Sequence, residues 1–592
     1  MSERKAYLRA AEALRDNPGQ WAAYESTGNC VVLAGPGSGK TKTLVTKMAR
    51  MLAEDVAEPR GIACITYNNE CARELESRLA DLGVLPGKRV FIGTVHSFSL
   101  TQIILPYAQV AKMGLPAGFG IALRSESAAA LAVAVGDTMN YAGNPQDWAS
   151  EVARYRRSYL IRDGEDWLTK DPELAALADA YEAELRRRGL IDFDDMPLLA
   201  YRALREHVWL RRSLLAKFPI LVVDEYQDLG LALHRMAVGL CLQTGMRLFA
   251  VGDPDQSIYG FNGAMPERLI ALSNERNIEK VRLTLNYRSG KNIVAAAGVA
   301  LGADRGYRAI PSSSQGLVFI HPLTGDFDAQ AQHLFGDLLP EVMARQPELR
   351  YGDIAVIYPA AWIGDAVARA AQQAGIPQVR TDAKALYPRA SRLMQWLELC
   401  AQWGSGGWRS GRIRFSRLAA EGRGLFAQAL LGEDAATRFN RDLITCLSAL
   451  REGAMPLYDW LRQMDDQVMG ACREACTGLR EDFDTLAAFL ARTAPDGDCQ
   501  QMTLRDMAGD GGFLNRMTLS TLHSAKGREF SVVFLFGLNE GRLPRGDVSE
   551  RGLKEARRLF YVGLTRAKRE VHLMHSAELA SRFVTEIEQH LQ

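Results

Sequence analysis

The sequence predicts an α/β protein built from doubly wound parallel sheets that carry two mainly helical inserted segments. First, an apolar run at 30–34 breaks into a glycine-rich loop and continues as a helical pattern from Lys40. Second, several further short apolar runs end in polar residues, as strands of an open parallel sheet do at a ligand-binding edge. Third, the strand pattern disappears at about 101–190 and again at about 386–510, and returns each time. Together these observations indicate βα units interrupted by helical subdomains.

The stretch from Asn29 to Leu44 has the strand, loop and helix start of a phosphate-binding loop. Its glycines would let backbone N–H groups point at a polyphosphate, and the helix N-terminus would add partial positive charge. Lys40 would reach the β- and γ-phosphates, and Thr41 would hold Mg²⁺ through its hydroxyl. The strict pattern begins with Gly where this chain has Ala34, which still permits close approach. The candidate nucleotide-binding residues of the loop are Ala34, Gly35, Pro36, Gly37, Ser38, Gly39, Lys40 and Thr41.

Polar residues also stand close to the first strand and at the ends of the next two. Gln20 precedes the first strand, and its amide could pair with an adenine edge, although an ordinary surface glutamine is the simpler explanation. The expected strands at 61–66 and 89–92 lead into Tyr67-Asn68-Asn69 and Gly93-Thr94-Val95-His96. Parallel strands present such residues at one edge of the sheet, where ligands bind.

An apolar strand expected at 220–223 runs directly into Asp224 and Glu225. This is the pattern that hydrolysis of a magnesium nucleotide requires. Asp224 would hold the metal, commonly through water. Glu225 would orient and deprotonate the attacking water. Surface charge is the alternative explanation, and the preceding phosphate-binding loop argues against it.

The following strand, at 247–251, leads to Gln256, Tyr259 and Phe261. Gln256 is suited to sense a terminal phosphate or the water that attacks it. The flat rings of Tyr259 and Phe261 could stack on unpaired bases. They could equally belong to the core, and the sequence leaves both explanations open.

We expect a second sheet in the rest of the chain, beginning with a strand at 282–285 that leads to Tyr287 and Arg288. Further strands are expected at 317–321, 353–358 and 517–520, in the apolar run SVVFLFGL and in EVHLMHS.

The two helical segments contain features that allow more than one explanation. EVARYRRSYLIR and YEAELRRRGL in the first have Arg-rich faces, for which exposure to solvent is the default. The second contains a glycine- and arginine-rich stretch at 403–417, expected as a flexible loop that is either a linker or a DNA-contacting surface. Cys472 and Cys476 lie four apart, and their spacing matches no standard zinc pattern.

Composition limits the classes of function. The net charge is +1 from 71 basic and 70 acidic residues, so nucleic-acid binding would need a local groove. The chain has no run of eighteen apolar residues that predicts a membrane span, and its charged start does not resemble a signal peptide. The nine scattered cysteines suit a reducing compartment. We therefore expect a cytoplasmic protein without membrane contact, divided into several domains or subdomains.

Nine elements occur in the order in which superfamily 1 DNA helicases carry them, and the chain resembles the UvrD/Rep type. They are AGPGSGKT, ITYNNECAREL, GTVHSFS, DFDD, VVDEYQD, VGDPDQSIYGF, NYRS, TLHSAKGREF and RRLFYVGLTRAK. The resemblance covers both ends of the chain. It is weakest at 101–190 and 386–510, where that family has two variable insertions.

This resemblance implies two RecA-like domains with ATP between them, single-stranded DNA across the top and movement from 3′ to 5′. The first core would comprise 1–100 and 191–278, with 101–190 as its helical insertion. The second core would comprise 279–385 and 511–592, with 386–510 as a reduced helical insertion.

The resemblance also implies a role for individual residues at matching motif positions. Gln20 and Tyr287 would contact adenine, and Glu529 the ribose. Gln256 would sense the γ-phosphate, and Arg288 and Arg566 would supply positive charge to it, beside the catalytic Asp224 and Glu225. The positions near DNA in this family are matched by Thr66, Asn68, His96, Tyr259, Phe261 and His523.

Three departures from the family pattern stand out. Phe261 is followed by Asn262, where the family usually has Trp followed by Arg, so the contact of that arginine is missing. Arg528 replaces a usual leucine and adds positive charge beside the ribose position. The span from Arg288 to Thr518 is short for the family, which implies a reduced second insertion.

Three hypotheses follow. The leading one is an ATP- and Mg²⁺-dependent 3′–5′ helicase that acts on single-stranded DNA and on junctions with duplex. The second is a motor subunit of a larger assembly with a partner nuclease, as in recombination or anti-phage defence, that unwinds weakly alone. The third is a nucleotide-gated binding protein that never translocates, against which Glu225, Gln256, Arg288 and Arg566 argue.

Overall fold

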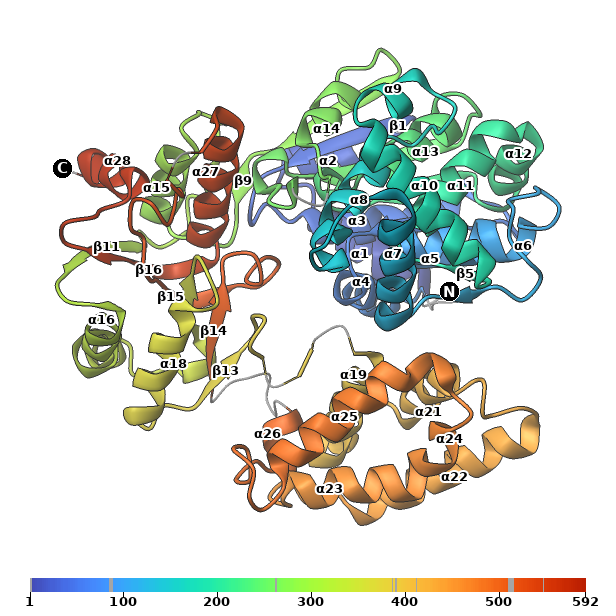
Figure 1. The fold of residues 1–592 in the computed structure, drawn as a ribbon. Helices are drawn as coiled ribbons and strands as arrows, with labels where there is room; N and C mark the ends of the chain where they lie inside the picture. The colour runs from blue at the N-terminus through green and yellow to red at the C-terminus, as the bar shows by residue number, and fades with distance from the viewer. Residues whose placement is uncertain are drawn as a thin grey trace. The chain divides into compact units, whose positions relative to one another are not determined.

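A computed structural model describes residues 3–84, 89–260, 263–385, 387–388, 391–410, 413–508, 516–546 and 548–591. The chain forms two compact units, which are described separately below (Figure 1). Unit 1 comprises Met1–Gly316 and Val548–Thr565, and unit 2 comprises Leu317–Asp547 and Arg566–Gln592. Within the described residues, no helix combines the length and the apolar character needed to cross a membrane.

Unit 1 contains a six-stranded parallel sheet in the order β3-β2-β6-β7-β1-β8. Its strands are β1 (Asn29–Ala34), β2 (Ile62–Thr66), β3 (Val90–Thr94), β6 (Ile220–Val223), β7 (Arg247–Gly252) and β8 (Ile278–Leu283). Successive residues of β1 enter different cores, Val31 on one face of the sheet and Cys30 and Val32 on the other. Burial on both faces explains why the central strands read as continuous apolar runs.

The helices that cover this sheet follow the strands as βα units require (Figure 1). The Cys30 face is covered by α3 and α4, which contribute Leu44, Met48 and Leu75, and the Val31 face by α11, α12 and α13. The α-helices that accompany this sheet in sequence are α1 Glu3–Glu12, α2 Pro18–Glu25, α3 Lys40–Arg50, α4 Asn69–Asp81, α5 Val95–Phe98, α6 Leu105–Tyr107, α11 Asp195–Glu206, α12 Val208–Lys217, α13 Leu231–Cys241 and α14 Pro266–Leu272.

Strand β8 corrects one prediction. The sequence placed a strand at 282–285 in the second sheet, but Ile278–Leu283 pairs in parallel with β1 at the edge of the first sheet. Buried and exposed residues follow one another along β8 without a regular period, because β8 lies at the edge of the sheet. The short apolar pattern in the sequence therefore did not show with which sheet this strand pairs. The expected division of the cores at 278/279 passes through the start of this strand. The next residues stay in unit 1 as β9 (Leu285–Asn286), α15 (Lys291–Leu301) and β10 (Arg308–Ala309), with α27 (Glu550–Leu564).

The first helical segment of unit 1 has its own core, formed mainly by α7 (Arg124–Thr138), α8 (Ala149–Ser158), α9 (Glu165–Thr169) and α10 (Pro172–Arg187). Two short strands, β4 (Gly120–Ile121) and β5 (Leu190–Ile191), close its ends. Its Arg-rich faces are not all solvated as expected. Arg156 is buried and forms ion pairs with Glu182, Asp192 and Asp195.

Unit 2 contains a second six-stranded parallel sheet in the order β11-β16-β15-β12-β14-β13. Its strands are β11 (Leu317–Leu323), β12 (Ile354–Tyr358), β13 (Gln378–Arg380), β14 (Met517–Thr521), β15 (Phe530–Leu535) and β16 (Ala567–Ser576). The helices beside them in sequence are α16 (Phe327–His333), α17 (Leu339–Arg345), α18 (Ile363–Gln373) and α28 (Arg582–Leu591). Two parallel sheets with interleaved helices confirm the predicted fold class.

The second helical segment has a separate apolar core in unit 2. Its helices are α19 Arg392–Gln402, α20 Trp408–Ser410, α21 Phe415–Leu425, α22 Glu433–Ala449, α23 Leu457–Met464, α24 Gly470–Arg473, α25 Arg480–Thr493 and α26 Leu504–Ala508. The stretch at 403–417 was expected as a flexible loop, but helical turns run from Trp403 to Ser410 and resume at Phe415, anchored by the buried ring of Trp403. Cys472 and Cys476 are buried free thiols, and no group of three metal-binding side chains occurs among the described residues.

Candidate functional site

The phosphate-binding loop of unit 1 connects β1 to α3 through a tight backbone turn. Gly37 has φ 63°, and a Cβ atom placed on it would lie 2.6 Å from Cβ of Arg288. The Ser38 hydroxyl donates to the carbonyl of Gly35 (2.7 Å), which closes the turn. Within the described part of the chain, the buried Nζ of Lys40 has no hydrogen-bond acceptor, and Oε1 of Glu225 lies 3.8 Å away. A buried ammonium in this position favours an anionic ligand.

The acidic residues after β6 face this lysine. Asp224 is buried, and its backbone N–H donates to Ile65 O (2.8 Å) at the end of β2. Burial and the charge of Glu225 raise the pKa of Asp224 to about 7, while Lys40 opposes the shift. Glu225 has φ 49°, a left-handed conformation that non-glycine residues rarely adopt and that often marks functional sites.

These residues fit a magnesium nucleotide. The carboxyl of Asp224 and the hydroxyl of Thr41 are oxygen donors of the type that Mg²⁺ prefers. Two protein ligands suffice there, because the remaining positions are normally taken by phosphate oxygens and water. A cation would also favour the charged form of Asp224 and so oppose the rise that burial and Glu225 give to its pKa.

Gln227 connects the acidic residues to the loop after β7, a role that the sequence did not predict. The fully buried amide of Gln227 donates to Oε2 of Glu225 and accepts from the backbone N–H of Asp253 (2.9 Å). The Asp253 carboxylate in turn accepts from Nε2 of Gln256 (2.8 Å), so the proposed phosphate sensor faces Asp253. Burial raises the pKa of Asp253 to about 7, against the opposing charge of Lys40. The motif VVDEYQD contains Gln227, but nothing local in it predicts these partners.

The residues proposed to contact adenine gather at the other side of the loop. Nε2 of Gln20 donates to the carbonyl of Ser38 (2.8 Å). Asn17 caps α2 by accepting from the backbone N–H groups of Gly19 and Gln20. The backbone N–H of Tyr287 donates to Gly37 O (2.8 Å), and its side chain is 45% exposed. An exposed ring beside the loop is available for stacking on a base.

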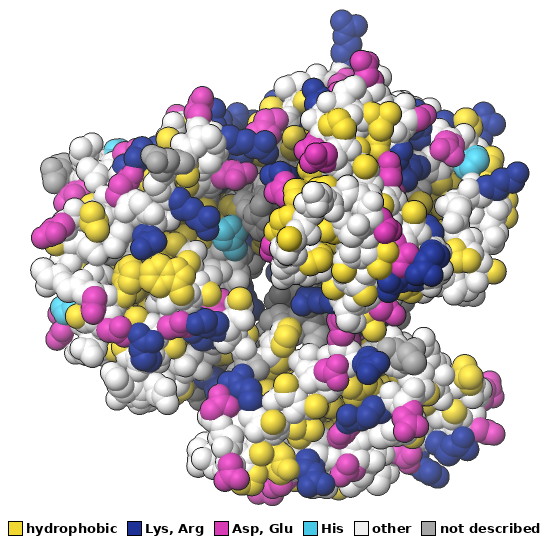
Figure 2. Space-filling view, in the orientation of Figure 1, with side chains coloured by type: hydrophobic (Ala, Val, Ile, Leu, Met, Phe, Trp, Pro, Cys, Tyr) yellow, Lys and Arg dark blue, Asp and Glu magenta, His cyan; other side chains and the backbone are white. Residues whose placement is uncertain are grey.

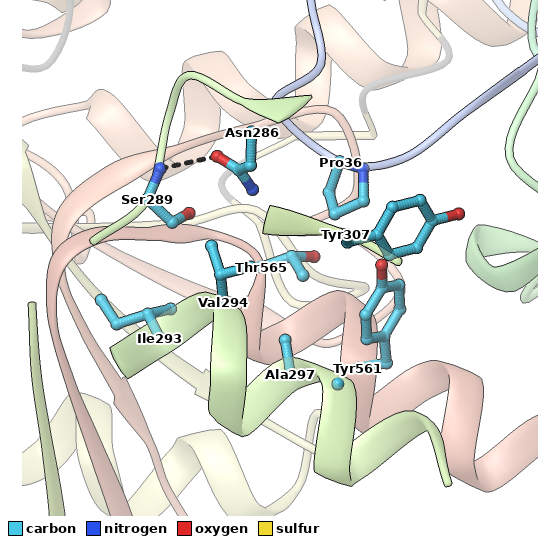
Figure 3. Close-up of a pocket in the computed structure, with 10 residues that line it drawn as sticks. Pro36, Asn286, Ser289, Ile293, Val294, Ala297, Tyr307, Tyr561 and Thr565 are labelled. Atoms are coloured by element: carbon cyan, nitrogen blue, oxygen red, sulfur yellow. Dashed lines mark hydrogen bonds between the residues drawn. The ribbon is translucent and has the colours of Figure 1, made fainter. Parts of the chain in front are cut away.

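Arg288 follows Tyr287 on a short turn held by Asn286. The Asn286 side chain accepts from the backbone N–H groups of Arg288 (2.7 Å) and Ser289 (2.9 Å), the second of which is drawn in Figure 3. Together with the close approach of Arg288 to Gly37, this turn brings both proposed nucleotide contacts to the phosphate-binding loop.

A segment without a recognised motif, Arg305–Tyr307, contacts the site in two places. The Arg305 guanidinium donates to both carboxylate oxygens of Asp255 (2.9 and 3.0 Å), next to Gln256. A Cβ on Gly35 would lie 2.5 Å from Cε1 of Tyr307, so this ring packs directly on the loop. Figure 3 shows Tyr307 beside Pro36 in a pocket that Tyr561 and Thr565 also line. No local signal in the sequence identifies either residue.

Two predicted nucleotide-site residues belong to unit 2. Arg566 follows α27, is buried, and donates from Nη1 to the carbonyl of Arg528 (3.1 Å). Glu529 pairs with Lys568 (2.8 Å). Both residues lie at the pairing of β15 with β16, where the Phe530 N–H also donates to the Arg566 carbonyl.

The DNA-contact candidates of unit 1 stand at the carboxyl ends of β2, β3 and β7. The ring of Tyr259 stacks on that of Tyr67 (4.7 Å between centroids, 18° between planes), so part of its surface is covered. Thr66 is buried, and the Asn68 side chain caps α4 by accepting from the Cys71 N–H (2.8 Å). Phe261 and Asn262 lie outside the described residues.

Phe193 is an exposed aromatic residue of the motif DFDD, for which the sequence predicted no individual role. Its side chain is 62% exposed, and it meets the His96 ring edge-on at 5.7 Å. Its neighbours Asp192 and Asp195 are buried against Arg156. This anchoring holds the exposed ring beside His96, whose pKa is lowered by burial.

His523 is the DNA-contact candidate of unit 2, and it follows β14. Burial lowers its pKa, and the positive charges of Arg545 and Lys526 lower it further. The imidazole is therefore favoured in its neutral form, which can both donate and accept a hydrogen bond.

Two models of known protein families match this chain. The model of the UvrD/REP helicase N-terminal domain matches residues 16–277, and that of the UvrD-like helicase C-terminal domain matches residues 452–578. Together they cover more than half of the chain. The chain belongs to the UvrD/Rep helicase family.

Relatives of this helicase align along most of its length. It is 27% identical to ATP-dependent DNA helicase Rep of Escherichia coli (strain K12), over 94% of this chain and 90% of the relative. It is 25% identical to ATP-dependent DNA helicase PcrA of Bacillus subtilis (strain 168), over 95% and 82%. It is 27% identical to ATP-dependent DNA helicase UvrD2 of Mycobacterium tuberculosis (strain ATCC 25618 / H37Rv), over 95% and 79%. These names favour the helicase hypothesis over the motor-subunit alternative.

Proposed function

We propose that this ATP-dependent DNA helicase moves from 3′ to 5′ along single-stranded DNA and separates duplex at single/double-strand junctions. The observation that carries the proposal is the convergence of Lys40, Glu225 and Asp224 on one glycine-rich loop, with Gln256 tied to the same group through Asp253. This arrangement supports hydrolysis of a nucleoside triphosphate, and the family supports DNA as the track.

The residues of the phosphate-binding loop and the polar residues that face it each have a defined task in this proposal. Lys40 would neutralise the β- and γ-phosphates, to which the backbone N–H groups of Gly37–Thr41 would also donate. Thr41 and Asp224 would hold Mg²⁺, which when bound neutralises phosphate charge. Glu225 would accept the proton of the attacking water, and Gln256 would turn from Asp253 toward the terminal phosphate.

The two arginines would link hydrolysis to movement. A guanidinium stabilises the charge that develops on the transferring phosphoryl group, which is worth roughly 10³-fold or more in rate. Arg288 stands beside Gly37 in unit 1, whereas Arg566 belongs to unit 2. If both act on one nucleotide, its hydrolysis state controls how the two units move.

Each unit carries candidate contacts for the strand. Tyr259, backed by Tyr67, and Phe193, beside His96, offer rings for base stacking. Phe261, Thr66, Asn68 and His523 remain candidates on the resemblance. Because Tyr67 covers part of its surface, Tyr259 would present the remaining face of its ring to a base.

The test combines ATPase and unwinding assays on the full chain. Single-stranded DNA should stimulate ATP hydrolysis strongly, and duplexes with a 3′ tail should be unwound while those with a 5′ tail are not. Lys40→Ala and Glu225→Gln should abolish both activities. Lys42→Ala is the matched control, since this lysine lies exposed on the same helix and its Nζ donates to the carbonyl of Ala13 (3.0 Å). Unwinding of 5′-tailed duplexes alone would overturn the polarity.

A further inference from the structure

The tryptophan that follows β12 is unusually exposed for its size. Trp362 lies between β12 and α18 and is 49% exposed, although tryptophan side chains are highly buried on average. An exposed large aromatic ring on a helicase surface is a candidate for contact with a ligand that has flat faces.

The backbone and the neighbours of Trp362 hold its ring in place. Arg380 donates from Nη2 to the carbonyl of Ala361 (2.8 Å) and also pairs with Asp365 at the start of α18 (2.7 Å). The ring of Phe327 meets the Trp362 ring edge-on at 5.7 Å, and Phe327 packs in turn on Phe536. These contacts restrain the ring, which would reduce the entropy lost on binding a ligand.

A positive charge lies over this ring. The guanidinium carbon of Arg542 is 5.1 Å from the ring centroid of Trp362, within the range of a cation–π contact. Arg542 is exposed on a turn whose backbone is fixed by a hydrogen bond to Asn539 O (2.9 Å), and Arg545 follows on the same turn. An exposed ring with an arginine beside it can stack on a base and attract its phosphate.

Trp362 stands at the same edge of the second sheet as the candidate DNA contact of unit 2. The Leu522 N–H donates to Tyr358 O (3.0 Å), and the Phe536 N–H donates to Ile357 O (2.8 Å). These bonds place the segments after β14 and β15 next to the end of β12. His523, a DNA-contact candidate, follows directly after Leu522, so Trp362 shares its sheet edge with a second DNA candidate.

We propose that Trp362 and Arg542 form a binding site for one unpaired nucleotide of single-stranded DNA, with the base stacked on Trp362 and its phosphate attracted by Arg542. The inference rests on the proposed movement along single-stranded DNA and assigns a track contact to unit 2. The site would read no sequence, because every base has a face on which to stack.

The experiment measures binding of fluorescein-labelled dT20 to the full-length helicase in the absence of ATP. Trp362→Ala should raise the Kd about 10-fold, as expected for loss of one base–aromatic stack, while Trp362→Phe, which keeps a flat ring, should recover most of the affinity. Arg542→Ala should weaken binding and reduce the slope of log Kd against log salt by about 0.7 for the single-stranded contact. Trp209→Ala is the matched control, because Trp209 is a 42% exposed tryptophan of unit 1.

An abasic oligonucleotide of the same length separates stacking from charge. Trp362→Ala should bind it as the wild type does, whereas Arg542→Ala should still bind it more weakly. Thermal unfolding of each Trp362 variant checks that the variant is folded, and the basal ATPase of the Trp209→Ala control should equal that of the wild type. If Trp362→Ala binds dT20 like the wild type, the site is wrong even though DNA still stimulates the wild-type ATPase. If the wild-type ATPase ignores DNA, the proposed function fails instead.

Discussion

The side-chain amide of Asn17 donates a hydrogen bond to the phenol oxygen of Tyr287 (3.1 Å), 270 residues further along the chain. The other side-chain atom of Asn17, Oδ1, accepts from the backbone N–H of Gln20 (3.1 Å). One buried asparagine thus holds both residues that we propose as adenine contacts. Both contacts join groups of the protein itself, so Asn17 positions Gln20 and Tyr287 relative to each other.

Asn17→Ala should therefore raise the KM for ATP several-fold while kcat falls less, because the residues it positions bind the base and take no part in hydrolysis. Losing the cap of α2 should also lower thermal stability, by about 1 kcal/mol for such a cap. Tyr287→Phe separates the two effects, since it removes the phenol oxygen and keeps the ring and the cap. An unchanged KM in both variants would show that this hydrogen bond does not position the site.

Gln227 should act through Glu225 and Asp253, to which its amide is bonded. Gln227→Ala leaves these two groups without their link, and we expect kcat to fall by roughly 10- to 100-fold, comparable to removing an outer-shell partner that orients a metal ligand. In a double-mutant cycle, Gln227→Ala should add little to the loss caused by Glu225→Gln, because the residues work as one unit. Full additivity in steady-state ATPase assays would contradict this role.

The Arg305–Asp255 ion pair predicts a second effect on the sensor loop. Arg305→Ala should lower the DNA-stimulated kcat and change the KM for ATP much less. The reason is that Asp255, the partner of Arg305, is next to the proposed sensor Gln256 and does not belong to the phosphate-binding loop. The pair is partly exposed, so its effect on stability should be small, about 1 kcal/mol or less. The exchanged pair Arg305→Asp with Asp255→Arg should recover part of the lost kcat. If kcat falls equally in the exchanged pair and in both single variants, loss of the ion pair is not the cause of the fall in kcat.

Asp253 predicts a pH dependence of stability without nucleotide. Burial raises its pKa from 3.8 to about 7, so between these values the folded protein holds a proton that the unfolded chain has released. The free energy of unfolding from this group therefore falls as pH rises toward 7 and then stays level. Asp253→Asn removes this titration, so its Tm relative to wild type should be more favourable at pH 8 than at pH 5. A Tm difference that is the same at both pH values, as expected for the exposed control Asp137→Asn, would be inconsistent with this account.

The sequence predicted those parts of the molecule that short patterns encode. The run before Asp224, the loop around Lys40 and the fold class all follow from local periodicity and glycine spacing. Partners distant in sequence were not accessible in this way. The pairing of β8 with β1, the burial of Arg156 among carboxylates, and the contacts of Gln227 and Arg305 depend on tertiary structure. A pattern of residue types states that a side chain is polar or apolar, but not which distant group satisfies it.

The most direct test of the account is the arrival of the helicase at the ends of single-stranded DNA after ATP is added. With a fluorophore at the 5′ end, the time before the signal should lengthen in proportion to oligonucleotide length, as movement from 3′ to 5′ requires. A 3′ fluorophore should show no such delay. Arg288→Ala and Arg566→Ala should still bind ATP and lose this length-dependent arrival. A delay that grows with length only for the 3′ label, or no length dependence at all, would contradict the account.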